Sequence, residues 1–561
     1  METIIETRIC RCWMHFDITT KDLEFYEKIS PVFNEVRYPI PSPSLCPDCR
    51  QQRRLSWRNE RHLYKRTCDA TWKEIISIYS PDKPYRVYNQ KDWWSDRWNP
   101  FDYAREFDFN RSFFEQFQDL QLKVPRLSLV LKDNENIEYW NDVEGSKDCY
   151  LVFNAWDVKN SYYSTWVWLN SSDLMDCLWA IESTDCYGCI KINNAHNSRF
   201  CMDCQDISHC AYCVDCIWCR NCFWCAWSYN KQYCIFNEQY EAEDYGIRLK
   251  ELARLNSPEL KMLIKEKQDR IPRRFIHSES SEKILWDYFN NSENCISCYD
   301  MMDSEDCKYC YDGITKDTYD IFNCWTECSR LYECVSSYFS TQILSSNFCH
   351  SSKELFYCDH CYSSSDLFWC IGLIHKRYCI LNKQYSKEEY ERLVPEIIER
   401  MRKDKEWWEF FPSSISPFWY NETLAQEYYP TVRDHVISEE LLKWSDYESP
   451  YPKVEKIIPA SKLPLDIKDI PDDILNWALT CEITGKPYRI IKQELDFYRK
   501  NSLPIPRRHP DQRHLERMKL RNPRKLFDRS CDKCWEGIKT TYAPDRKEIV
   551  YCESCYNQEL N

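Results

Sequence analysis

Four cysteines near the end of the chain have the spacing of a metal site. Cys531 and Cys534 form one CxxC pair, and Cys552 and Cys555 form a second pair after seventeen intervening residues. Four thiolates at this spacing close a tetrahedral shell around a structural zinc ion and leave no open position for a substrate. The sequence therefore predicts zinc as a cofactor with a structural role.

A second set of four cysteines lies at the other end of the chain. Cys10 and Cys12 supply a CxC pair, and Cys46 and Cys49 supply a CxxC pair. The CxC spacing is tighter than that of most structural zinc sites, but four thiolates again suffice for a tetrahedral shell. We therefore predict zinc at this site as well.

An ungapped internal duplication relates the two ends of the chain. Residues 46–92 align with residues 509–555 at a shift of 463. The counterparts of the C-terminal four cysteines are Cys68, Thr71, Asn89 and Asp92, and the counterparts of the N-terminal set are Cys481, Thr484, His509 and Gln512. Neither substituted set makes a good zinc shell, so we expect one zinc ion in each terminal module.

Basic residues cluster beside both predicted zinc sites, although the whole chain has a formal net charge of -14. The two matched stretches carry Arg53, Arg54, Arg58 and Arg61 at one end and Arg513, Arg517, Arg521 and Arg524 at the other. Such clusters make a positive field that attracts RNA or DNA. The alternative is a helical face whose arginines pair with the acidic central part of the same chain.

The middle of the chain repeats cysteines at every twelfth position. One row contains Cys177, Cys189, Cys201, Cys213 and Cys225, and a later row contains Cys298, Cys310, Cys334, Cys358 and Cys370. A free cysteine behaves as a small apolar residue, so we expect these thiols to fill a core. Extra metal sites are the alternative, and the dense group from Cys201 to Cys225 is the place for them.

A short fixed period is the signature of stacked repeats. Two copies of the cysteine block, related by a shift of 145, end in the similar segments 233–240 and 378–385. Short strands between polar turns predict a β-solenoid whose period is twelve or twenty-four residues. A run of small metal knuckles without a continuous sheet is the alternative. The expected fold class is mainly β with helical segments, a duplicated solenoid flanked by two zinc-ribbon-like modules.

The repeats divide the chain into six segments. They are an N-terminal zinc-ribbon-like module at 1–115, a first solenoid repeat at 134–245, a helical connector at 246–290, a second solenoid repeat at 291–385, a helix and linker at 386–475, and a C-terminal zinc-ribbon module at 476–561. Ser386 and Glu389 form a capping box that predicts a helix to about Lys405, with a kink or break near Pro395. The aromatic block 93–103 is expected to pack where the first module meets the solenoid.

The composition argues against several classes of protein. Glycine is scarce, at 7 of 561 residues, and no glycine-rich phosphate-loop motif occurs, which argues against nucleotide-binding enzymes of those classes. Neither a signal peptide nor a run of about 18 apolar residues is present, which predicts a cytoplasmic protein without a membrane partner. In that compartment the 35 cysteines stay reduced and form no disulfides.

Three segments carry a resemblance to a known group of proteins. They are CPDCRQQRR at 46–54, YSPDKPY at 79–85 and HPDQRH at 509–514. Through them the chain resembles an uncharacterised group of multi-zinc-ribbon, cysteine-rich proteins predicted from candidate-phyla bacterial genomes. The resemblance implies a shared architecture and no activity.

Three functions are open at this point. The first is a non-enzymatic, zinc-stabilised scaffold that contacts nucleic acid or a ribonucleoprotein through its basic terminal modules. The second is a protein-interaction scaffold that uses the aromatic surface of the solenoid. The third is a metal or redox enzyme, which lacks support because neither HExxH nor GxSxG occurs.

Overall fold

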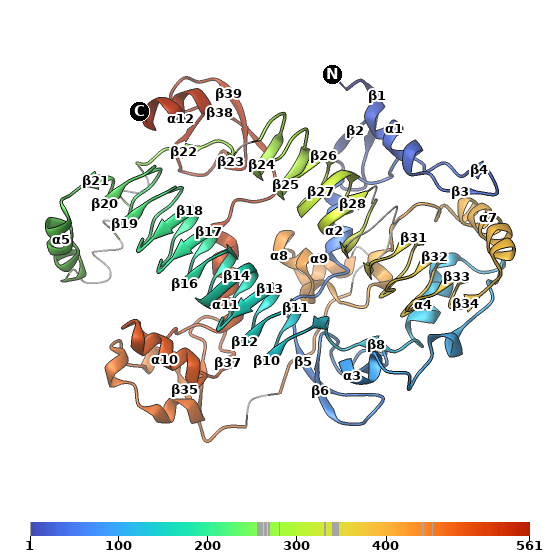
Figure 1. Cartoon of the computed structure of the whole chain (residues 1–561), viewed down its shortest axis with the longest axis horizontal. Coiled ribbons are helices and arrows are strands. Elements are labelled where there is room, and N and C mark those ends of the chain that lie inside the picture. Colours follow the sequence, from blue (N-terminus) through green and yellow to red (C-terminus); the bar gives the residue numbers. More distant parts are fainter. Residues whose placement is uncertain are drawn as a thin grey trace.

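The computed structural model describes residues 2–254, 262, 266, 270–279, 281–329, 332–338, 347–438, 443–450 and 453–560. Its centre consists of two β-solenoids, which Figure 1 shows as two separate ladders of short strands. Smaller modules formed by the two ends of the chain pack against these ladders. The predicted fold class is confirmed, with a duplicated solenoid between two cysteine-bearing modules.

The first solenoid ends beside helix α5 (Ala242–Arg254). Its strands are β9 (Leu131–Lys132), β10 (Glu135–Glu138), β11 (Asn141–Glu144), β12 (Lys147–Tyr150), β13 (Phe153–Lys159), β14 (Thr165–Met175), β15 (Leu178–Ile181), β16 (Thr184–Tyr187), β17 (Ile190–His196), β18 (Met202–Ser208), β19 (Arg220–Phe223), β20 (Gln232–Ile235) and β21 (Glu238–Gln239). Neighbouring coils pair in parallel, and Ile190 lies opposite Met202. The shorter of the two expected periods, twelve residues to a turn, is therefore the correct one.

The second solenoid is built in the same way and ends beside helix α7 (Lys387–Asp404). Its strands are β23 (Ser278–Glu279), β24 (Leu285–Asn290), β25 (Ile296–Met302), β26 (Glu305–Lys308), β27 (Tyr311–Tyr319), β28 (Phe322–Ser329), β29 (Val335–Tyr338), β30 (Asn347–His350), β31 (Lys353–Phe356), β32 (Ser365–Phe368), β33 (Arg377–Ile380) and β34 (Lys383–Gln384). Here Leu355 lies opposite Leu367, so the register advances by the same period.

Within each turn the chain changes direction at every third residue. Asp203, Asp206, His209 and Tyr212 all have left-handed backbone angles, with φ between 52° and 56°. Four three-residue sides therefore make one coil. Aspartate and asparagine tolerate this conformation better than most residues because their short polar side chains bond to nearby backbone. Their recurrence at the corners explains how the chain turns so often with so few glycines.

The residue after each corner points into the solenoid. Cys204, Ile207, Cys210 and Cys213 follow four consecutive corners, and none is more than 2% exposed. In the two solenoids, the cysteines from Cys149 to Cys310 and from Cys334 to Cys379 are buried free thiols. Among the described residues, no cluster of possible metal ligands includes one of these thiols. The expectation that the central cysteines fill a core is therefore met.

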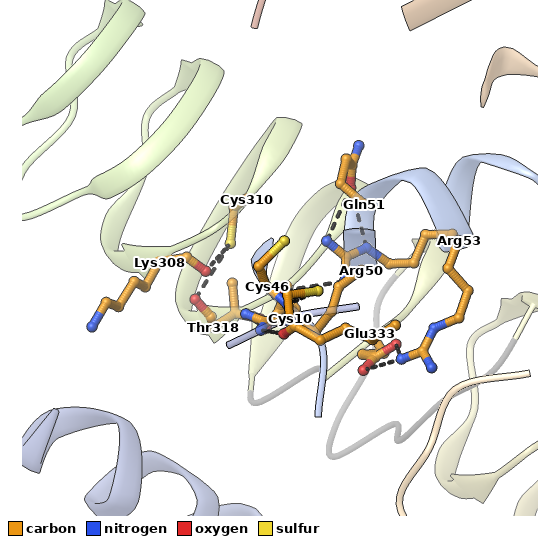
Figure 2. A network of polar contacts seen from close by, with 12 residues as sticks. Cys10, Cys46, Arg50, Gln51, Arg53, Lys308, Cys310, Thr318 and Glu333 are labelled. Carbon is orange, nitrogen blue, oxygen red and sulfur yellow. Dashed lines mark hydrogen bonds and ion pairs between the residues drawn. The ribbon is translucent and has the colours of Figure 1, made fainter. Parts of the chain in front are cut away.

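The inward thiols also form weak hydrogen bonds with backbone carbonyl oxygens. The thiol of Cys213 donates to the carbonyl oxygens of Ala211 at 3.6 Å and of Cys222 at 3.5 Å. Figure 2 shows the same arrangement for Cys310, whose thiol lies 3.4 Å from each of two backbone carbonyl oxygens. A thiol suits this place because it is small and apolar, yet can add a weak hydrogen bond to a carbonyl group that already accepts a backbone N–H.

Each solenoid closes with a tight antiparallel hairpin, β20–β21 or β33–β34. Phe236 and Asn237 at the first turn both have positive φ, as a type I′ turn requires. The side chain of Asn237 then bonds both the N–H and the C=O of Ala226, each at 2.8 Å. It takes the place of a further coil and covers the open edge of the last one. This role explains why both copies of the block end in nearly the same residues.

The terminal modules contain most of the helices that the structure describes. The N-terminal elements are β1 (Ile4–Ile9), β2 (His15–Thr19), α1 (Thr20–Ile29), β3 (Val32–Phe33), β4 (Val36–Arg37), α2 (Pro47–Leu55), β5 (Tyr64–Thr67), β6 (Glu74–Ser77), β7 (Val87–Tyr88), α3 (Gln90–Trp93), α4 (Phe113–Gln121) and β8 (Arg126–Leu127). The C-terminal elements are α8 (Leu424–Tyr428), α9 (Arg433–Ser438), β35 (Lys456–Pro459), β36 (Trp477–Thr480), β37 (Pro487–Tyr488), α10 (Lys492–Lys500), α11 (Pro510–Leu520), β38 (Phe527–Ser530), β39 (Gly537–Thr540), β40 (Val550–Tyr551) and α12 (Glu553–Leu560).

One local prediction is met in part and a second is met. Helix α7 begins at the capping box of Ser386 and Glu389 and continues to Asp404 as one helix with Pro395 in its interior, so no break occurs there. In the aromatic block, Trp93 is 1% exposed and lies close to Gly372 of the second solenoid. This is the packing role that the sequence predicted.

The six predicted segment limits stay predictions. Helix α5 opens the predicted helical connector at 246–290, but residues 255–261, 263–265, 267–269 and 280 of that connector lie outside the described residues. In the described parts of the chain, no helix has the length and apolar character needed to cross a membrane.

The small inward column gives a first test. We expect Cys213→Leu to destabilise the protein by about 1 to 3 kcal/mol, because the larger side chain overpacks the column. Cys213→Ser should cost less, since Ser198 already occupies an inward position and donates to the His196 carbonyl at 3.0 Å. The exposed, outward-facing control Gln232→Leu should change stability by no more than about 0.5 kcal/mol. Urea denaturation measures all three, and equal losses for Leu at 213 and 232 would contradict the inward placement.

Candidate metal centres

The four C-terminal cysteines come together as one cluster. Cys531 and Cys534 lie in the turn between β38 and β39, Cys552 follows β40, and Cys555 is in the first turn of α12. Their sulfur atoms all lie within 4.8 Å of one another. The Cys534 and Cys552 sulfurs are 3.6 Å apart, and the backbone N–H of Cys552 donates to the Cys531 sulfur at 3.3 Å. This arrangement can hold one tetrahedral metal ion.

The N-terminal four cysteines form an equivalent cluster. Cys10 and Cys12 lie in the turn between β1 and β2, Cys46 caps helix α2, and Cys49 lies in its first turn. The Cys12 and Cys46 sulfurs are 3.5 Å apart, and the N–H of Cys46 donates to the Cys10 sulfur at 3.2 Å. These contacts match those of the C-terminal cluster one for one. The short CxC spacing therefore still places its two sulfurs correctly.

In each cluster one thiol ionises more readily than an ordinary cysteine, and the thiolate is the form that binds metal. The neighbouring thiols and burial raise the pKa of other members of the clusters, such as Cys49 and Cys555. In the N-terminal cluster, a hydrogen bond from the Cys49 thiol lowers the pKa of Cys46 to about 5. In the C-terminal cluster, burial raises the pKa of Cys531, but backbone N–H groups, chiefly those of Cys534 and Cys552, outweigh it and bring that pKa to about 6.

The two substituted half-modules each keep one cysteine, whose sulfur accepts hydrogen bonds. The Cys68 sulfur accepts from the backbone N–H and from the side-chain amide of Asn89, both at 3.4 Å. The Cys481 sulfur accepts from the backbone N–H of Thr484 at 3.5 Å. The prediction that these half-modules bind no zinc rests on their ligand sets.

All four half-modules share one turn. The residue after the second ligand position has a left-handed backbone in each, and these residues are Trp13, Trp72, Gly485 and Trp535. The three tryptophans expose 84%, 80% and 78% of their surface. The common turn supports the internal duplication and extends the likeness of the modules to the segment around Cys10 and Cys12.

Helix α2 connects the N-terminal cluster to the second solenoid. Arg50 donates two hydrogen bonds to the Asp320 carboxylate, at 2.8 and 2.9 Å, and Arg54 donates one to the same carboxylate at 3.1 Å. Arg53 pairs with Glu333 at 2.7 Å, and Figure 2 shows this pair beside Cys10 and Cys46 at the start of the helix. Asp320 has a fully buried side chain, so both guanidinium groups meet it out of contact with water.

Helix α11 connects the C-terminal module to the first solenoid in the same way. Arg513 and Arg517, the counterparts of Arg50 and Arg54, both bind Asp176, and the Arg517 contact measures 2.8 Å. Asp176 and Asp320 both occupy left-handed corners of their solenoids. Each terminal module therefore clamps one solenoid through two arginines one helical turn apart.

The loops after these helices reach the opposite solenoid. Arg58 pairs with Asp142 of the first solenoid, and its counterpart Arg521 pairs with Asp300 of the second at 3.0 Å. Arg524 contacts the same carboxylate at 2.7 Å. Although burial raises the pKa of Asp300, Lys191 and the two arginines hold it well below its ordinary value. Each module thus holds both solenoids.

The eight arginines assigned from the sequence to nucleic acid are internal. They are Arg53, Arg54, Arg58, Arg61, Arg513, Arg517, Arg521 and Arg524, and none exposes more than 9% of its side chain. Arg61 donates to Thr165 at 2.6 Å, and the others pair with carboxylates. This arrangement matches the intramolecular alternative, because buried and paired guanidinium groups present little surface to a phosphate backbone. Nucleic-acid contact through these arginines stays a prediction.

The carboxylates that these arginines bind were not identified from the sequence. Asp176, Asp300 and Asp320 look like the other corner aspartates of the repeat, several of which lie in solvent. The signal that could have found them is the paired duplication, since two copies of an arginine helix require two matching acidic sites. Only the packing of the modules shows which corners those are.

Comparison with known proteins adds little. No family model and no curated protein matches this chain. Among solved structures, a proposed acetyltransferase from Desulfovibrio desulfuricans G20 is similar at 7% identity over 46% of this chain and 68% of that chain, with a TM-score of 0.08. This likeness is too slight to relate the two folds, and the resemblance drawn from sequence motifs stays an expectation.

The clamp on Asp320 can be tested by removing its charge. We expect Asp320→Asn to destabilise the protein by about 3 to 5 kcal/mol, because Arg50 and Arg54 would remain buried without a counter-charge. The matched control is Asp303→Asn, at an exposed left-handed corner of the same solenoid, which should cost no more than about 0.5 kcal/mol. Urea denaturation at neutral pH measures both. Equal losses for the two variants would show that the buried pair has no special weight.

Proposed function

We propose that this protein is a non-enzymatic, zinc-stabilised scaffold that binds a protein partner on an outer face of its first solenoid. The observation that carries the proposal is a group of exposed aromatic side chains on that face. Trp218 and Tyr229 expose 51% and 54% of their surface, and their rings lie 5.0 Å apart. Trp156, which is 53% exposed, lies six coils earlier in the same row as Tyr229 and is separated from it by the buried Trp168 and Ile181.

The chemistry of this face suits a protein. Tryptophan and tyrosine supply large contact areas with few rotatable bonds and dominate many protein interfaces. The parallel coils beneath hold them in place, so little ordering is needed on binding. Nucleic-acid binding is the less favoured function, because the eight arginines of its predicted basic surface form contacts inside the molecule.

Zinc is the metal we propose for both four-cysteine clusters. Four thiolates in a closed tetrahedral shell are the usual structural zinc site, and no ligand position is left for a substrate. In this role the metal fixes the turn that carries Cys10 or Cys531 against the first turn of α2 or α12. Because α2 is also a clamp on the second solenoid, metal loss would loosen that contact.

Metal content tests the zinc assignment. We expect Cys49→Ser and Cys555→Ser each to lower bound zinc by one ion per chain, and the double variant to lower it by two. The controls Cys68→Ser and Cys481→Ser alter the substituted half-modules and should leave the content unchanged. Elemental analysis of purified protein gives these numbers. Equal losses in all four variants, or none in the first two, would refute the assignment.

Site-specific photo-crosslinking in the native host tests the partner. A photoreactive residue at position 229 should give a protein adduct that the Trp218→Ala change reduces at least about tenfold, since loss of an aromatic anchor typically costs about 2 kcal/mol or more. The same residue at position 72 should not give this adduct, although Trp72 is 80% exposed. Circular dichroism confirms that each variant is folded. Adducts with RNA or DNA, or identical adducts at both positions, would contradict the proposal.

A further inference from the structure

A third group of potential metal ligands lies apart from the two four-cysteine clusters. Asp203 and Asp215 stand one turn apart on the same corner row of the first solenoid. His277 comes from the segment between β22 (Arg273–Arg274) and β23, where the second solenoid begins. One atom of each side chain lies within 4.8 Å of the others.

Neighbouring residues orient the imidazole ring of His277. Its Nδ1 lies 3.0 Å from Asp287, whose buried carboxylate also accepts the hydroxyl of Thr541. The ring stacks on Tyr288, with centroids 4.5 Å apart and planes 2° from parallel. An Nδ1–H that donates to a carboxylate leaves Nε2 as the free ligand atom, and this is the usual support for a metal-binding histidine.

Two of the atoms that would bind the ion make no hydrogen bond among the described residues. Nε2 of His277 and Oδ1 of Asp203 are buried, and neither has a hydrogen-bond partner in that part of the chain. Nε2 is 3.4 Å from Oδ1 of Asp215, with side-chain exposures of 13% and 10%. Two atoms that each lie about 2.1 Å from one metal ion at a tetrahedral angle are roughly 3.4 Å apart. The distance between Nε2 of His277 and Oδ1 of Asp215 thus fits two ligands of one ion.

Two cationic side chains border the group, and neither contacts Asp203. Lys191 pairs with Asp300 and lies over the ring of Tyr288. Arg273 lies 3.6 Å from Oδ2 of Asp215, the oxygen that does not face His277. The unpartnered oxygen of Asp203 is therefore paired with neither cation, and a bound divalent ion would supply its counter-charge.

We propose that Asp203, Asp215 and His277 bind a divalent transition-metal ion of the class of Mn²⁺, Fe²⁺ and Zn²⁺. One imidazole nitrogen and two carboxylate oxygens suit these ions, and three protein ligands leave room for water. The segment with His277 is anchored because β22 pairs with β40 of the C-terminal module. The ion would therefore join the first solenoid to the start of the second and to that module.

Manganese binding to the zinc-loaded full-length protein tests the site, because Mn²⁺ prefers oxygen and nitrogen ligands and does not compete for thiolates. Electron paramagnetic resonance of free Mn²⁺ should show one bound ion per chain. His277→Ala should weaken binding at least about 100-fold, and Asp287→Asn, which removes only the support, about 10- to 100-fold. Added Zn²⁺ should displace the manganese, since zinc binds such ligands more tightly.

Controls separate the site from the fold. Asp206→Asn, at the next corner of the same coil, should bind Mn²⁺ as the unaltered protein does. If the His277→Ala variant does not fold, the Asp203→Asn variant tests the metal site in its place, because asparagine keeps the left-handed corner and the shape of the side chain. Absence of Mn²⁺ and Zn²⁺ binding beyond the four-cysteine clusters would overturn the proposal and favour a protonated His277 between Asp215 and Asp287. Wild-type affinity in Asp203→Asn would overturn it as well.

Discussion

The solenoids depend on a left-handed corner at every third residue. Each coil made of four such sides encloses a narrow column that the inward side chains fill. Cysteine is the commonest of the described inward side chains, and larger ones such as Ile207 and Leu367 occupy other inward positions. Cysteine is small and apolar, and its thiol can add a weak hydrogen bond to a carbonyl that already accepts a backbone N–H, as Cys213 does with Ala211 and Cys222. The abundance of cysteine in the central region thus follows from the narrow interior of the coils.

Buried arginine–aspartate pairs decide how the modules dock. Asp320 and Asp176 each receive two arginines from one helix, so a shift of that helix by a single residue would leave charges unpaired. Pairs of this kind add little net stability, because removing the charges from water costs almost as much as the attraction returns. Their effect is to exclude other arrangements. The same pairing occurs in both terminal modules, so each module docks on its solenoid in the same way.

The scaffold proposal combines these two features. Metal at the four-cysteine clusters would hold the first turns of α2 and α12, and α2 in turn holds the second solenoid through Asp320. The coils then present Trp218 and Tyr229 on a rigid surface. A third metal ion at Asp203, Asp215 and His277 would add a further link between the two solenoids.

The sequence by itself determined the solenoid, its duplication and the two four-cysteine clusters, because these follow from spacings along the chain. The interval between Cys201 and Cys213 fixes the coil, and the CxxC pairs at 531 and 552 fix a metal shell, whatever the rest of the molecule does. The roles of Arg53, Arg517 and their neighbours could not be predicted in this way. A run of arginines looks the same whether it faces water or a buried carboxylate, and only tertiary packing brings Glu333 or Asp176 within reach. The same is true of His277, whose partners in the first solenoid lie far earlier in the chain. Contacts between distant segments depend on how the modules stack, and no local spacing records that.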